Sequence, residues 1–167
     1  MPRPDLTLVL LTPRTAARTW PRGAAAHPSR SSRRVSAHLD TNVLVRHLTG
    51  EPPAQAAAAT RLLTTAGDLI LHDLVIAELV YVLESYYRLT RNHIATILEA
   101  VIAFPSIRIN DPLVIHGALR HYERLNIDFA DAYLAASASA DGVRVVASFD
   151  RDLDRVATIR RIDPGAR

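Results

Sequence analysis

Short apolar segments alternate with longer amphipathic segments along most of the chain. Apolar runs bounded by turn residues predict strands at residues 35–39, 69–71, 107–109, 143–147 and 158–162. Apolar positions at helical spacing predict helices at residues 41–48, 54–65, 74–87, 92–103, 111–125 and 128–140. Strands that alternate with helices indicate the α/β class, with a parallel central sheet that has helices on both faces.

The first 35 residues lack this pattern. They are rich in Pro, Arg, Ala and Ser, a composition that buries too little apolar surface to fold. We interpret residues 1–35 as a disordered extension or as the result of a start codon assigned too far upstream. An Arg-rich, acid-poor segment also has a faint similarity to an organellar transit peptide. Residues 36–167 are expected to form one domain, with no internal repeat.

Charge and composition limit the chemistry. The chain has no cysteine, which excludes disulfides and thiolate metal sites, so that a metal ion would need oxygen or imidazole ligands. Residues 1–36 carry a net charge of +6 and residues 37–167 a net charge of −3. The basic isoelectric point therefore comes from the extension and is weak evidence for nucleic-acid binding. No apolar run approaches the roughly 18 residues of a membrane span, and a cytoplasmic protein is expected.

Two carboxylates follow predicted strands. Asp40 comes directly after the run at residues 35–39, and Asp150 follows the run at residues 143–147. The carboxyl ends of parallel strands share one edge of a sheet, where ligand sites form. We therefore expect Asp40 and Asp150 to be neighbours in space.

Two further carboxylates lie in apolar helices. Glu78 shares a helical face with Val75 and Leu79, which predicts that its charge points inward. Asp131 is surrounded by small apolar residues, and Asp128 lies one turn earlier on the same face. Both helices therefore place charge where a purely structural protein would place an apolar side chain.

A cluster of these acids would be unstable without compensation. Two unit charges about 5 Å apart repel by roughly 3 kcal/mol at an effective dielectric of 20, so the cluster needs protons or a cation. Oxygen ligands favour Mg²⁺ or Mn²⁺, which suit phosphodiester hydrolysis. Each acid also has an ordinary alternative role: a helix N-cap for Asp40 and Asp128, a turn residue for Asp150, and a partner of Arg for Glu78.

Four ordered segments resemble the successive motifs of PIN-domain ribonucleases, and more narrowly those of VapC-type toxins from bacterial toxin–antitoxin pairs. These segments, between residues 37 and 164, are LDTNVLVRHLTGE, LVIAELVYVLE, DFADAYLAASA and VVASFDRDLDR. The resemblance implies a three-layer α/β/α sandwich and an endoribonuclease that depends on Mg²⁺ or Mn²⁺. It assigns the catalytic and metal-binding roles to Asp40, Glu78, Asp131 and Asp150.

The resemblance also implies accessory residues. Asn42 would orient Asp40 or a water, Asp128 matches an acid that many members carry, and Ser148 supplies a hydroxyl where members often have Thr. Because the chain has no Lys, RNA contacts must come from Arg. Arg46 and Arg151 are the candidates because they lie near Asp40 and Asp150 in the sequence, although ordinary surface charge is an alternative.

The expected partners follow from the same resemblance. They are an RNA substrate, a cognate VapB-type antitoxin and a second copy of the chain. The apolar and aromatic stretch at residues 80–87 could make these protein contacts or could be ordinary core.

Other functions remain open. A phosphatase that phosphorylates a strand-end Asp, like the haloacid dehalogenases, needs a second Asp two residues later, where this chain has Asn42. A DNA nuclease would use the same acids, and the residue that reads the 2′-hydroxyl of RNA cannot be found from sequence. A non-catalytic PIN-like RNA-binding module is the remaining alternative, and the presence of all four acids argues against it.

Overall fold

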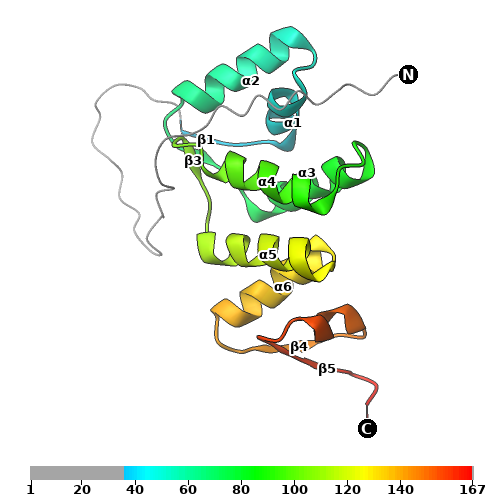
Figure 1. The fold of residues 1–167 in the computed structure, drawn as a ribbon. Helices are drawn as coiled ribbons and strands as arrows, with labels where there is room; N and C mark the ends of the chain where they lie inside the picture. Colours follow the sequence, from blue (N-terminus) through cyan, green and yellow to red (C-terminus); the bar gives the residue numbers. More distant parts are fainter. Residues whose placement is uncertain (1–35, 167) are drawn as a thin grey trace, which may run out of the picture. The chain divides into compact units, whose positions relative to one another are not determined.

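The computed structural model describes residues 36–166, which divide into two compact units (Figure 1). The first unit contains residues 36–88 and Ile97–Asn110, and the second contains Leu89–Thr96 and residues 111–166. The interpretation of residues 1–35 as an extension lies outside the described residues.

The first unit is built on a parallel three-stranded sheet. Strands β1 (Ala37–His38), β2 (Leu69–Ile70) and β3 (Ile107–Arg108) pair in the order β1-β2-β3. Ala37 is in register with Leu69, and Leu69 with Ile107. The helices are α1 (Thr41–Thr49), α2 (Pro53–Thr65) and α3 (Asp73–Ser85), and α1 packs against the other two. Helix α4 (Arg91–Ile102) starts in the second unit and ends in the first.

The second unit joins a helical hairpin to a parallel strand pair. Helices α5 (Pro112–Leu125) and α6 (Phe129–Ala140) lie against each other (Figure 1). The two helices approach closely at Gly117, which has no side chain. A Cβ atom added there would lie only 3.1 Å from the Cβ of Ala136. Strands β4 (Val145–Ala147) and β5 (Arg160–Ile162) pair in parallel, and a 3₁₀ helix, η1 (Arg151–Arg155), connects them.

Local sequence explains where several helices begin and end. Helix α5 begins at Pro112 because the side chain of Asp111 accepts hydrogen bonds from the N–H groups of Leu113 and Val114. Helix α1 ends at Thr49. The N–H of the C-cap Gly50 donates to the carbonyl of Arg46, and the left-handed φ of 74° at Gly50 turns the following chain away from the helix. Among the described residues, none of the helices has the length and hydropathy that a membrane crossing requires.

The predicted α/β class and the parallel direction of the strands are confirmed. Hydrogen bonds group the described strands into one set of three and one set of two, one set in each unit. The strands are shorter than predicted. In the run at residues 143–147 the strand begins only at Val145, because Gly142 and Arg144 have φ values of 82° and 54° and are not extended.

Candidate active site

Asp40 stands between the first strand and the first helix. It follows the buried Leu39 and occupies the N-cap position of α1, but its side chain makes no capping hydrogen bond. The residue is exposed and its backbone is extended, with φ −93° and ψ 149°. The carboxylate of Asp40 is therefore not used to stabilise the helix, which argues against the simple N-cap alternative.

Glu78 is held by Thr41, which the sequence motifs do not identify as a site residue. The Thr41 hydroxyl donates a hydrogen bond to Oε2 of Glu78 over 2.5 Å, which links the first turn of α1 to the middle of α3. Thr41 is only 4% exposed. Its spacing of three and four residues from the buried Leu44 and Val45 is the signal that could have placed it inside.

The predicted orientation of Glu78 is wrong. The residue is exposed, and the buried face of α3 consists of Ile76, Leu79, Val80 and Leu83. Glu78 therefore lies beside the buried face instead of on it. Its carboxylate carries one ordered donor, from Thr41, and remains accessible to a ligand.

The surroundings of Asp131 oppose its negative charge. It lies in the first turn of α6 and is partly buried. Loss of hydration raises the pKa of Asp131, and the carboxylates of Asp150, Asp128 and Asp152 raise it further. Negative charge thus accumulates around Asp131 in the second unit.

Asp150 has a local structural role as well as its predicted one. It follows β4 and caps η1 with Oδ1, which accepts the N–H of Asp152 at 2.8 Å. The N–H of Asp150 donates to the Ser148 hydroxyl at 3.0 Å, so Ser148 fixes the backbone of this loop. Asp152, which also faces Arg155 at 2.9 Å, was not singled out from the sequence, although the alternating acids of FDRDLD place it two residues from Asp150.

Asp128 is bound by an arginine. Nη2 of Arg91 lies 2.9 Å from Oδ1 of Asp128, while Nη1 donates to the carbonyl of Ile127. The Arg91 guanidinium also lies 4.9 Å from the centre of the Tyr122 ring. Asp128 occupies the N-cap position of α6 without a side-chain capping bond. Its clearest role is to anchor Arg91 at the start of α6.

The predicted metal ligands are divided between the units. Asp40 and Glu78 belong to the first unit, and Asp131 and Asp150 belong to the second. Within residues 36–166, no group of three or more His, Asp or Glu side chains is arranged to hold a metal ion. The donor chemistry nevertheless fits Mg²⁺ or Mn²⁺, because all four groups are carboxylates and the charge around Asp131 needs compensation. The four-acid metal site stays a prediction.

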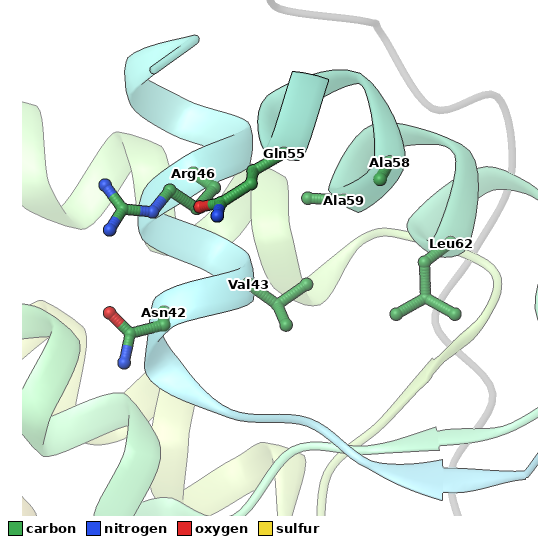
Figure 2. Close-up of a pocket in the computed structure, with 7 residues that line it drawn as sticks. All are labelled: Asn42, Val43, Arg46, Gln55, Ala58, Ala59 and Leu62. Carbon is green, nitrogen blue, oxygen red and sulfur yellow. The ribbon is translucent and has the colours of Figure 1, made fainter. Parts of the chain in front are cut away.

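A pocket of about 540 Å³ lies between α1 and α2 in the first unit. It is lined by Asn42, Val43, Arg46, Gln55, Ala58, Ala59 and Leu62. Figure 2 shows Asn42 and Arg46 on the same side of α1, with Gln55 reaching from α2 towards Arg46. Nη1 of Arg46 also donates to the carbonyl of Glu51 at 3.3 Å. The pocket is therefore lined by apolar side chains and by the polar side chains of Asn42, Arg46 and Gln55. Asn42 is two residues after Asp40 in the sequence.

The comparison with protein families decides the classification. The PIN domain profile matches residues 37–159, a span that includes all four predicted acids. The chain belongs to the PIN domain family. PIN domains are generally nucleases that use divalent metal ions, so a nuclease-type function is indicated for this PIN domain. No curated protein matches the chain.

Proposed function

We propose that this PIN domain is a Mg²⁺- or Mn²⁺-dependent endoribonuclease that acts as the toxin of a VapBC-type toxin–antitoxin pair. The observation that carries the nuclease proposal is the PIN domain match over residues 37–159, which includes all four acids. Burial, and then the neighbouring carboxylates of the second unit, raise the pKa of Asp131, which agrees with this proposal. Such an accumulation of negative charge is unfavourable without a cation. An enzyme could use these clustered carboxylates to bind a metal ion, whereas in a purely structural domain their repulsion would only reduce stability.

Asp40, Glu78, Asp131 and Asp150 would hold the metal ion. When bound, the ion would supply the Lewis acidity that activates water and neutralises charge on the phosphodiester.

Other residues of the chain position these acids. Thr41 holds Oε2 of Glu78, and Ser148 holds the backbone of Asp150. Arg46 and the exposed Arg151 would contact the RNA backbone, because phosphates are gripped mainly by cationic side chains. Cleavage would leave a 5′-phosphate and a 3′-hydroxyl.

The proposed partners are a VapB-type antitoxin and a second copy of the chain, in the cytoplasm. The stretch at residues 80–87 contains buried, half-buried and exposed residues. Val80 and Leu83 are core, whereas Tyr81 and Tyr86 are 68% and 75% exposed. Tyr81 and Tyr86 are therefore the most exposed part of this stretch, and they suit protein contacts because Tyr is enriched at interfaces.

Incubation of the full chain with RNA tests the proposed function. The protein is freed of any antitoxin by denaturation and refolding, and Mg²⁺ or Mn²⁺ is added. We expect the wild type to cleave RNA and the Asp40→Asn variant to be inactive. Asp141→Asn is a matched control, because it removes one exposed negative charge but keeps the oxygen that accepts the N–H of Val143.

The possible outcomes separate the alternatives. Equal cleavage by wild type and Asp40→Asn would contradict the metal-site proposal. Preferential cleavage of DNA with the same base sequence would indicate a DNA nuclease. Binding of RNA without cleavage of any RNA tested would indicate a non-catalytic module.

A further inference from the structure

Phe149 is an exposed aromatic residue beside a predicted metal ligand. It lies between Ser148 and Asp150 in the connection from β4 to η1 and is 74% exposed. The apolar residues around it in the sequence, Val146 and Leu153, are buried at 5% and 1% exposure. This segment therefore buries Val146 and Leu153 and leaves its one aromatic ring in water, at the cost of the stabilisation that burial would give.

The backbone that carries Phe149 is fixed on both sides. The Ser148 hydroxyl accepts the N–H of Asp150, and the Ser148 carbonyl accepts a hydrogen bond from Nη1 of Arg161 at 2.9 Å. A Cβ atom added at Gly165 would lie 3.7 Å from Cε1 of Phe149, so the turn at Gly165 lies against one edge of the ring. A ring presented from a fixed backbone loses little entropy when a ligand covers it.

We propose that Phe149 is a stacking platform for an unpaired base of the RNA, next to the phosphodiester that is cleaved. This inference rests on the proposed nuclease function, which places the scissile phosphate at Asp150. Aromatic side chains bind single-stranded nucleic acid by stacking on base faces, and the bases of a duplex are not available for this contact. The exposed Arg151, two residues after Phe149, has the charge to grip the adjoining phosphate. The substrate would then be RNA that is unpaired at the cleavage site.

Substitutions at Phe149 separate stacking from general hydrophobic contact. Affinity for a 5′-labelled single-stranded RNA is measured by fluorescence anisotropy in an Asp40→Asn background, which keeps the RNA intact if Asp40 is catalytic. We expect Phe149→Ala and Phe149→Leu to weaken binding by about 5- to 150-fold, the range reported for loss of one stacked base. Phe149→Trp should bind at least as tightly as the parent. Leu113→Ala, which removes a 79%-exposed apolar side chain from α5, should have no effect.

Abasic RNA identifies the contact directly. If one base stacks on Phe149, removing that base should weaken binding to the parent and leave binding to Phe149→Ala unchanged. Two results would overturn the proposal. In the first, Phe149→Leu binds the RNA as tightly as the parent does. In the second, every abasic substitution weakens binding to Phe149→Ala as much as it weakens binding to the parent. A protein that shows the expected binding pattern but cleaves no RNA with Asp40 restored would refute only the nuclease function.

Discussion

Replacing Thr41 with Val tests whether a buried hydroxyl holds Glu78 in position. Valine keeps the shape of the side chain but removes the O–H that donates to Oε2 of Glu78 over 2.5 Å. A hydrogen bond to a charged group contributes about 1.5–3 kcal/mol, and the exposure of Glu78 reduces this to about 1–2 kcal/mol. We therefore expect the variant to melt about 2–8 °C below the wild type.

Calorimetry and urea unfolding at pH 7 without metal ions measure this loss. Thr41→Ser is the matched control, because it keeps the hydroxyl and removes only a buried methyl group. The decisive comparison is a double-mutant cycle with Glu78→Ala, in which Thr41→Val should cost almost nothing. An equal cost in the presence and absence of the Glu78 carboxylate would refute the proposed coupling between these residues.

Three further substitutions test the second unit. Asp131→Asn should raise the melting temperature at pH 7 in metal-free buffer, because burial and neighbouring carboxylates raise the pKa of Asp131 above its ordinary value of 3.8. The charged form of Asp131 lowers the free energy of unfolding, and this loss grows as the pH rises from 3.8 through the raised pKa. The variant should therefore gain no stability below pH 3.8. An increase in melting temperature that is the same below pH 3.8 as at pH 7 would contradict the electrostatic explanation. Arg91→Met should lower stability to urea by about 1–3 kcal/mol, since it removes contacts with Asp128, the Ile127 carbonyl and the Tyr122 ring. Asp128→Asn should lower the free energy of unfolding by less, because the contacts of Arg91 with the Ile127 carbonyl and the Tyr122 ring remain. An equal or larger loss would show that the ion pair with Asp128 dominates.

The strands and the acids that follow them could be predicted because they depend on local pattern. Leu39 is buried and Asp40 is exposed, so the change from apolar to charged residues marks a real strand end. In the second unit the change is less sharp, because β4 ends at Ala147 and the exposed Phe149 still separates the strand from Asp150. The lengths of the strands could not be predicted, because positive φ angles at positions such as Arg144 are set by the turn and not by hydrophobicity.

The orientation of Glu78 could not be predicted because α3 is apolar on more than one face. Leu74 and Tyr81 are 80% and 68% exposed, so hydrophobic periodicity alone does not identify the buried stripe of this helix. The bond between Thr41 and Glu78 joins residues 37 positions apart and arises only from the packing of α1 on α3. Whether the four acids act together likewise depends on tertiary structure and stays a prediction.

The capping bond of Asp150, combined with its proposed role as a metal ligand, has an evolutionary consequence. Its Oδ1 accepts the N–H of Asp152, a role that Asn fills about as well as Asp at a helix N-terminus. A lineage that no longer needed the charge at this position could therefore lose it through Asn with little damage to the loop, whereas Ala would remove both functions at once. Descendants of this domain that have abandoned catalysis should accordingly retain a capping residue at position 150 while losing its charge.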